Sequence, residues 1–301
     1  MVISERNESG HGMGKLEEKQ KLPLISVGIP TYSRPEGLRH TLDCITGQTY
    51  KNLEIIVSDN ASPGVETEEV VREFMEKDAR IKYFRQSVGI PVIDNFMTVL
   101  EKAQGSYFMW AADDDSWDSD WIEKLIRSYR PNAVLYFGRL IVIDNEGKNK
   151  HPTAELEFSG GLILRSLKFA FQDEFRGKAN LFYGLFRTVI IREELKKGMK
   201  DCFASDVLLL YSVLQHGEFV EVQDTKFYKK LGGAGDRVSH SYAPWVRASG
   251  SYLIPYYAEY IRRSDRVLLK IFLLMSFPYL LLRANVNRIS RFFINKLNEA
   301  L

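Results

Sequence analysis

Short apolar runs alternate with amphipathic stretches along the first 130 residues. The first run, over 24–29, stops at Pro30 and has the pattern of a strand buried on both faces. Leu38, Leu42 and Ile45 then recur on one side of a predicted helix. The expected elements are strands over 24–29, 53–58, 81–84 and 107–111, separated by helices over 35–46, 65–77 and 94–104. This βαβαβ order predicts a parallel α/β sheet that binds ligands at its carboxyl edge.

The second half of the chain is less regular. Its pattern predicts a strand over 133–143, a helix over 160–171, an apolar segment over 183–191 and a helix over 205–216. Glycines at positions 232, 233 and 235 predict a mobile loop. We divide the chain into a disordered leader (1–21), two halves of one large domain (22–130 and 131–263) and a helical tail (264–301).

Composition excludes several classes of protein. The 301 residues are 45% hydrophobic and 27% charged with a formal net charge of +2, which suits a globular protein and does not indicate nucleic-acid binding. Cys44 and Cys202 lie far apart, so neither a zinc site nor a disulfide framework is indicated. The leader has no apolar region of the kind found in secretory signals. A reducing, cytoplasmic compartment is therefore expected.

Three consecutive carboxylates, Asp113, Asp114 and Asp115, directly follow the predicted strand over 107–111. They repel one another unless a cation neutralises them, and Mg²⁺ or Mn²⁺ commonly combines one or two carboxylates with substrate phosphates. The alternative is a solvated helix start, where acids interact favourably with the dipole of a helix over 120–130. The position after a buried strand favours a divalent metal site.

Polar residues also follow the first two strands. Pro30, Thr31 and Tyr32 end the first strand, and Asp59 and Asn60 end the second. A tyrosine ring can stack on a base, and a carboxylate can accept a hydrogen bond from a base N–H or a ribose hydroxyl. Each residue alone is typical of a turn. Together, at successive strand ends, they predict a nucleotide pocket beside the aspartates.

Two longer motifs carry a family resemblance. They are ISVGIPTYSRP at 25–35 and QTYKNLEIIVSDNAS at 48–62, spaced before the aspartates and the WDSD sequence at 117–120. Over 24–130 the chain resembles the family 2 glycosyltransferases. The resemblance implies a GT-A fold, which is Rossmann-like with a mostly parallel sheet flanked by helices, here with a helical C-terminal extension. It also implies transfer of a sugar from a nucleotide-diphosphate donor, with UDP expected, to an acceptor hydroxyl with inversion.

The resemblance assigns 22–130 to nucleotide-sugar binding. Thr31, Tyr32 and Asp59 would hold the base and ribose, and the neighbouring Pro30 and Arg34 complete this part of the site. Asn60 replaces a common second aspartate, which leaves the preference for the donor base open.

The aspartate triplet takes the place of the family's D-x-D element, which binds the metal and the diphosphate. Two registers are open. If Ser116 and Trp117 set the alignment, Ala112 replaces the usual first aspartate and Asp114 is the principal ligand. In the literal register, Asp113 meets the ribose and Asp115 meets the metal.

The resemblance also assigns 131–263 to acceptor binding. Asp206 follows a serine that replaces the first acid of the family's acidic pair, and it is the implied general base. The alternative for Asp206 is an acid that only favours a helix N-terminus. Arg187 lies in a stretch similar to an acceptor-side segment.

Basic residues flank the glycine loop. Lys229, Lys230 and Arg237 are expected to close over the diphosphate as a lid when the donor binds, or to form a solvated basic loop.

The tail has its own pattern. Residues 267–282 are strongly apolar but contain Lys270 and Pro278 and are shorter than the roughly twenty residues that span a bilayer, so no spanning helix is expected. Residues 285–297 place apolar side chains opposite arginines, the pattern of a helix lying on a membrane surface. Packing on the catalytic domain or in a homodimer explains this pattern equally well. Contact with the inner face of the membrane would suit a lipid-linked acceptor, and a saccharide acceptor is the other expectation.

Two other functions use similar residues. A nucleotidyltransferase combines an α/β nucleotide fold with metal-binding carboxylates, but it is expected to have a glycine-rich loop after the first strand, and 30–34 is not one. The alternative outside enzymes is a non-catalytic module that binds a nucleotide sugar or a partner. Intact Asp59, Asp114 and Asp206 favour the enzyme, with a role expected in cell-surface polysaccharide or glycolipid synthesis.

Overall fold

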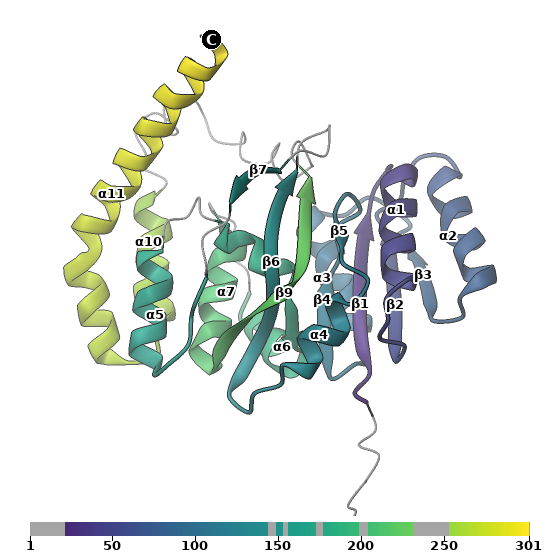
Figure 1. The fold of residues 1–301 in the computed structure, drawn as a ribbon, viewed down its shortest axis with the longest axis horizontal. Coiled ribbons are helices and arrows are strands. Elements are labelled where there is room, and N and C mark those ends of the chain that lie inside the picture. Colours follow the sequence, from purple (N-terminus) through teal and green to yellow (C-terminus); the bar gives the residue numbers. More distant parts are fainter. Residues whose placement is uncertain are drawn as a thin grey trace, which may run out of the picture.

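The structure is a computed structural model that describes residues 22–143, 149–152, 156–172, 177–198, 204–230 and 253–300, with side chains in these ranges except 149–152 and 287–300. Within them, nine strands form one mixed sheet covered by helices on both faces (Figure 1). The strands are β1 (Ile25–Thr31), β2 (Leu53–Asp59), β3 (Ile81–Arg85), β4 (Tyr107–Trp110), β5 (Ser116–Trp117), β6 (Ala133–Ile143), β7 (Asn149–Pro152), β8 (Leu185–Arg187) and β9 (Glu218–Lys230). The helices are α1 (Pro35–Thr46), α2 (Glu66–Lys77), α3 (Val92–Lys102), α4 (Trp121–Arg127), α5 (Leu162–Phe171), the 3-10 helix η2 (Lys178–Tyr183), α6 (Thr188–Lys196), α7 (Ser205–His216), α10 (Leu253–Arg263) and α11 (Val267–Ala300).

The N-terminal half has the predicted βαβαβ order. β1 pairs in parallel with β2 and β4, and β2 pairs in parallel with β3. β1 continues through Pro30, where the sequence predicted that it would stop. A proline is tolerated there because pairing with β4 ends at Gly28, so its missing N–H removes no bond of that ladder.

The second half extends the same sheet rather than forming a separate one. The strand order is β3-β2-β1-β4-β8-β6-β9-β5, with β7 added to β6. β6 and α7 match their predicted ranges, whereas the apolar segment over 183–191 divides into β8 and the start of α6. β8 is antiparallel to both β4 and β6, and β6 pairs with β9 in parallel. β5, β7 and β9 were not predicted.

The core has two layers, one on each face of the sheet. Phe108 and Trp110 of β4 pack on the side of α3, α6 and α7, while Tyr107 and Met109 pack on the side of α1 and α4. This alternation is that of a strand buried on both faces. α7 is buried almost all round, which holds its first residues in a fixed position relative to the sheet.

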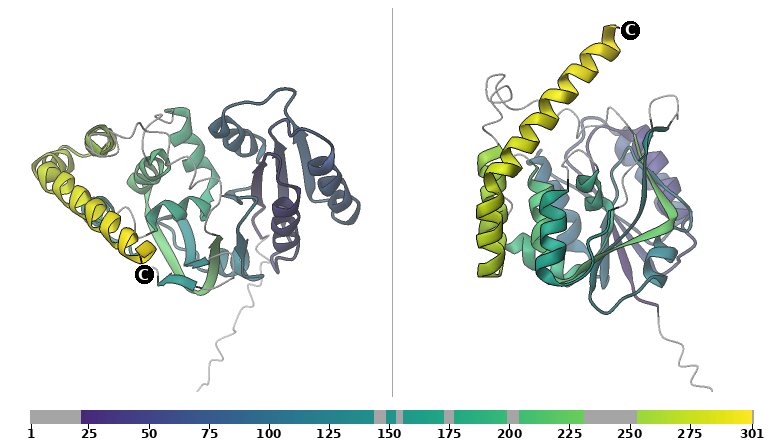
Figure 2. Two further views of the ribbon diagram at one scale, coloured as in Figure 1. Left: turned by 90° about the horizontal axis from the view of Figure 1, so that it is seen from above. Right: turned by 60° about the vertical axis from the view of Figure 1, so that its left-hand side comes forward.

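The tail differs from its prediction. α11 is one helix of 34 residues that contains Pro278. By length and composition alone, Val267–Val286 could cross a membrane, with a mean hydropathy of 1.8 and 22% of its window buried. The expectation that this stretch is too short was therefore wrong. α11 contacts α10 and α5 and lies on the outside of the domain, away from the sheet (Figure 2).

Several sequence predictions lie outside the described residues. These are the leader, Cys202, the glycine loop with Arg237, and the side chains beyond Val286 that would form the amphipathic face over 285–297.

Candidate active site

The aspartate triplet lies between β4 and β5, at the carboxyl edge of the parallel strands, as predicted. Its three side chains do not all have the same hydrogen-bond partners. Asp113 accepts a hydrogen bond from the Thr31 hydroxyl (2.8 Å) and one from Arg34 Nη1 (3.1 Å). Asp114 accepts from the same guanidinium nitrogen at 2.7 Å. Arg34 therefore bridges two of the three carboxylates.

Asp115 belongs to a separate, buried ion pair. Its carboxylate accepts from Lys229 Nζ (2.9 Å) and from the backbone N–H of Lys230 (3.2 Å). Burial raises the pKa of Asp115 to about 6, although Lys229 opposes the shift. Burial lowers the pKa of Lys229, but the nearby Tyr183 and Asp115 outweigh it, and the net shift is upward. Lys229 and Lys230 are the last two residues of the strand β9 rather than part of a loop.

Helix α1 packs unusually close to the triplet. A Cβ on Gly37 would lie 2.1 Å from the backbone oxygen of Asp113, so only glycine fits without displacement. The Thr41 hydroxyl donates to the backbone oxygen of Ala112 (2.9 Å). The first two turns of α1 therefore support the turn that carries the aspartates.

The turn after β2 is organised around Asp59, which is fully buried. One of its oxygens accepts from both the N–H (2.9 Å) and the hydroxyl (2.5 Å) of Ser62. The other accepts from the Tyr83 hydroxyl (2.9 Å) and lies 3.8 Å from Nε of Arg85. In this arrangement all the contacts of Asp59 are internal, and they hold the turn after β2 in place. Its interactions with Ser62, Tyr83 and Arg85 were not predicted, although Ser62 is part of the quoted motif.

Asn60 ties this turn to the segment before α3. Its amide nitrogen donates to the carbonyl of Ile90 (2.9 Å), and its amide oxygen accepts from the N–H of Ile90 (2.8 Å). An aspartate at this position could accept but could not donate, because a carboxylate has no N–H. The two contacts with Ile90 therefore explain why this chain has an asparagine at position 60, because they need both a donor and an acceptor.

Three non-glycine residues among those described have left-handed backbone conformations: Ser33 (φ 52°), Ala61 (φ 57°) and Ala204 (φ 50°). Ser33 follows Tyr32, Ala61 follows the Asp59 turn, and Ala204 precedes α7. Such conformations persist where surrounding contacts enforce them and are concentrated at functional sites.

Asp206, the second residue of α7, faces the same region. Burial raises the pKa of the Tyr183 phenol to about 12, and among the nearby charges Lys229 opposes the shift while Asp115, Asp206 and Asp114 add to it. α7 ends just before β9 begins. Because β9 is parallel to β6, and β8 is antiparallel to both β6 and β4, the first turn of α7 with Asp206 lies at the same edge of the sheet as the triplet. Tyr183 was not predicted as part of the site.

The family model for glycosyl transferase family 2 matches residues 26–197, more than half of the chain. The chain belongs to this family. The match includes the residues at the ends of β1, β2 and β4, and it removes the nucleotidyltransferase interpretation.

Known glycosyltransferases are similar to this chain in sequence and in fold. A *Campylobacter jejuni* protein named GalNAc(5)-diNAcBac-PP-undecaprenol beta-1,3-glucosyltransferase is 26% identical over 69% of this chain and 65% of its own length. The *Bacillus subtilis* protein TuaG, named a putative teichuronic acid biosynthesis glycosyltransferase, is 31% identical over 34% of this chain and 40% of its own length. The chain thus spans less than two thirds of either relative.

The solved structures show the same architecture. *S. aureus* TarS 1–349 in complex with UDP-GlcNAc superposes with a TM-score of 0.61 at 14% identity, covering 88% of this chain and 72% of that one. The mannosyltransferase PcManGT from *Pyrobaculum calidifontis*, in complex with GDP-Man and Mn²⁺, gives 0.55 at 16% identity, covering 89% and 74%. At this level of identity the likeness confirms the predicted GT-A fold.

Among the residues that the structure describes, the aspartate triplet does not form a cage of three carboxylates around one metal position. Within the part of the chain that the structure describes, no group of three His, Cys, Asp or Glu side chains converges on one point. The Asp115 side chain is fully buried against Lys229, and that of Asp113 is 11% exposed and accepts from Thr31 and Arg34. Asp114 has the most exposed side chain of the three, at 18%, and its one side-chain contact among the described residues is with Arg34. One accessible carboxylate still fits a cation that takes most of its ligands from diphosphate and water. Asp114 is the member of the triplet that suits this role.

Arg187 does not lie with the other predicted residues. It ends β8 opposite Tyr107, at the amino edge of β4, and donates to the carbonyl of Pro131 (2.7 Å). The antiparallel direction of β8 carries it away from the aspartates. The structure therefore places Arg187 at the opposite edge of the sheet from the aspartates. Tyr32, by contrast, is 56% exposed at the end of β1 and is accessible to a ligand.

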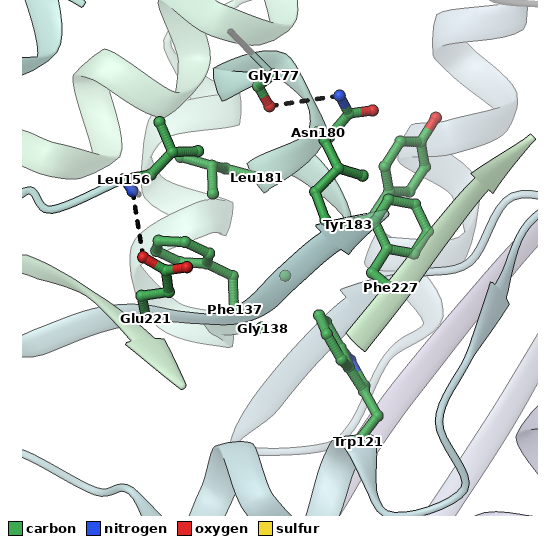
Figure 3. A pocket seen from close by; sticks show the side chains of 12 residues that line it. Trp121, Phe137, Gly138, Leu156, Gly177, Asn180, Leu181, Tyr183, Glu221 and Phe227 are labelled. Atoms are coloured by element: carbon green, nitrogen blue, oxygen red, sulfur yellow. Dashed lines mark hydrogen bonds between the residues drawn. The ribbon is translucent and has the colours of Figure 1, made fainter. Parts of the chain in front are cut away.

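A small cavity lies between α4, β6, η2 and β9. It has a volume of about 20 Å³ and is walled by Trp121, Phe137, Tyr183 and Phe227, with Glu221 at one side (Figure 3). A cavity of this size holds about one water molecule. It is too small for a nucleotide.

Proposed function

We propose that this chain transfers a sugar from a nucleoside-diphosphate donor to an acceptor hydroxyl, by a single in-line displacement that inverts the anomeric carbon. The observation that carries the proposal is the arrangement at one sheet edge of Asp59, the aspartate triplet and Asp206. The family membership supports glycosyl transfer, and the complexes of TarS with UDP and UDP-GlcNAc favour UDP as the nucleotide.

The ends of β1 and β2 form the proposed nucleotide pocket. Tyr32 is exposed and can stack on the base. Asp59 holds Ser62 and Tyr83 in place, and Ser62 in turn accepts a hydrogen bond from the N–H of Ser33 (2.8 Å). This series of contacts joins the turns after both strands, so the base would meet a preformed surface.

The diphosphate is proposed to lie at the triplet, where Arg34 and Lys229 supply positive charge. Arg34 Nη1 already lies 2.7 Å from Asp114 Oδ2 and can exchange this contact for a phosphate oxygen. Asp114 is the residue that would hold a divalent cation, which, when bound, would neutralise charge that develops on the departing diphosphate. Lys229 keeps Asp115 in a separate ion pair, whereas Asp113 shares the Arg34 guanidinium with Asp114.

Asp206 is the proposed general base. It would accept the proton of the attacking hydroxyl as the bond to the anomeric carbon forms, and the nucleoside diphosphate would leave from the opposite face. The name of the *Campylobacter* relative refers to an undecaprenol-linked saccharide, which supports a lipid-linked acceptor and synthesis of a cell-surface polysaccharide or glycolipid.

A donor screen tests the proposal. Purified protein is heated with UDP-, dTDP- and GDP-sugars, with Mn²⁺ or with EDTA. A UDP-sugar at about 100 times its Kd should stabilise the fold by roughly 2.7 kcal/mol, and only when Mn²⁺ is present. UDP release is then compared between the wild type and Asp206→Asn. Binding without any release above that variant would support the non-catalytic module, and no binding of any nucleotide sugar would refute both.

A further inference from the structure

An apolar surface covers the outer side of α11. Nine large apolar side chains of Val267–Val286 are each at least 48% exposed, with Met275 (77%) and Leu282 (65%) among them. The surface continues across a groove onto α5, where Leu164 is 55% exposed. Monomeric soluble proteins rarely expose contiguous apolar patches larger than a few hundred Å². The α11 surface, defined here as the exposed side of Val267–Val286, therefore suggests a partner.

The opposite side of the same helix is already packed. Leu269, Leu273, Leu280 and Ala284 are buried, and the contacts of α11 are with α10 and α5. At about 100° per residue, these four side chains lie on the side of the helix away from the exposed ones. The helix is thus attached to the domain, and it lies outermost in Figures 1 and 2.

Positive charge borders the α11 surface. By the same helical geometry, Lys270 and Arg283 fall on its two opposite edges, and Arg266 precedes its first turn. Arg283 also donates to the carbonyl of Phe171 in α5, so Lys270 and Arg266 are the cations at this border that the described residues leave for a partner. Val267–Val286 contains no acidic residue. Long basic side chains at the edges of an apolar face can reach lipid headgroups while their stems stay against hydrocarbon.

The charges help to decide which kind of partner covers the α11 surface. In a two-fold contact with a second copy, the α11 surface would meet itself, and its cations would find no acid within Val267–Val286. A spanning arrangement would require α11 to leave α10 or to carry Glu259 and Arg263 of α10 into hydrocarbon. An anionic lipid surface satisfies the cations and covers the apolar side chains without unfolding anything.

We propose that the α11 surface docks on the headgroup boundary of a membrane that contains anionic lipid, with the helix lying in the membrane plane. The first twenty residues of α11 make this contact, upstream of the stretch over 285–297 that the sequence indicated. The proposal does not depend on the proposed function, because lipid binding is measured without donor or acceptor.

Co-sedimentation of the full chain with vesicles tests it. Vesicles of phosphatidylcholine with 30% phosphatidylglycerol are compared with pure phosphatidylcholine, and binding is expected to be stronger to the first and to weaken with salt without vanishing. The variant Phe272→Glu/Met275→Glu should bind at least tenfold more weakly. Both side chains are more than half exposed, so folding should not change. Val189→Glu is the matched control, since Val189 is 60% exposed on α6, and it should bind like the wild type.

Four results would overturn the proposal. The wild type could fail to bind either vesicle, or the double variant could bind as well as the control. Alternatively, the wild type could form a dimer in sedimentation velocity and fail to bind vesicles, with the dimer lost in the double variant but not in the control. That result would identify a second copy as the occupant. Protein that is soluble only in detergent and never exchanges between vesicles would indicate a spanning helix instead.

Discussion

Replacing Lys229 by methionine should leave Asp115 buried without its cation. The Lys229 Nζ to Asp115 Oδ2 distance is 2.9 Å, and the Asp115 side chain is fully buried. Methionine keeps most of the apolar stem beside Tyr183 and removes the charge. Breaking one side of a buried pair typically costs about 3–5 kcal/mol. For a domain of this size that corresponds to a fall in Tm of roughly 6–15 °C.

The sign of the pH dependence follows from Asp115. Its pKa is about 6 in the folded chain even with Lys229 present, above the value of about 3.9 for an exposed aspartate. A carboxyl whose pKa is raised on folding contributes stability below its unfolded pKa and loses it as pH rises through the folded value. Without Lys229, the backbone N–H of Lys230 is the one remaining contact among the described residues that offsets that loss. The variant should therefore be close to wild type near pH 4.5 and much less stable at pH 8.

Thermal unfolding at pH 4.5, 6 and 8 measures this. Lys230→Met is the control, because its side chain is exposed and only its backbone N–H contacts Asp115. Adding Asp115→Asn to Lys229→Met should recover stability at pH 8 and flatten the pH dependence. An equal loss of Tm at all three pH values, or a double variant no more stable than Lys229→Met, would refute the reasoning.

Three further predictions concern the reaction and its support. Asp206→Asn should keep its affinity for a UDP-sugar, measured by calorimetry, and lose roughly two orders of magnitude or more in kcat; a kcat near wild type would place the base elsewhere. Asp114→Ala should abolish the Mn²⁺-dependent thermal shift by donor, whereas an unchanged shift would remove Asp114 as the ligand. Gly37→Ala should destabilise the fold by about 1–3 kcal/mol and weaken donor binding, although alanine usually favours a helix, because its Cβ would strike the Asp113 carbonyl. Gly161→Ala, with nothing within 4 Å, is its control and should be neutral.

The sequence prediction is accurate where a regular local pattern coincides with burial. α1, β6 and α7 begin and end at their predicted residues, since each has a strong period or a run of apolar side chains. β9 was missed because its alternation is interrupted. The register with β6 shifts after Gly138, where Val222 and Lys226 become successive partners, so residues 223–225 break the period of two.

Sequence by itself determined that polar residues end β1 and β2, and that three carboxylates follow a buried strand, because chain order and apolar runs fix these positions locally. Only the tertiary structure decided how the carboxylates are divided. Arg34 bridges Asp113 and Asp114, while Lys229, more than a hundred residues away in sequence, pairs with Asp115. The direction of β8, which removes Arg187 from the site, is likewise set by pairing with distant strands. Side-chain partners depend on which elements pack together, and a linear pattern contains no record of that packing.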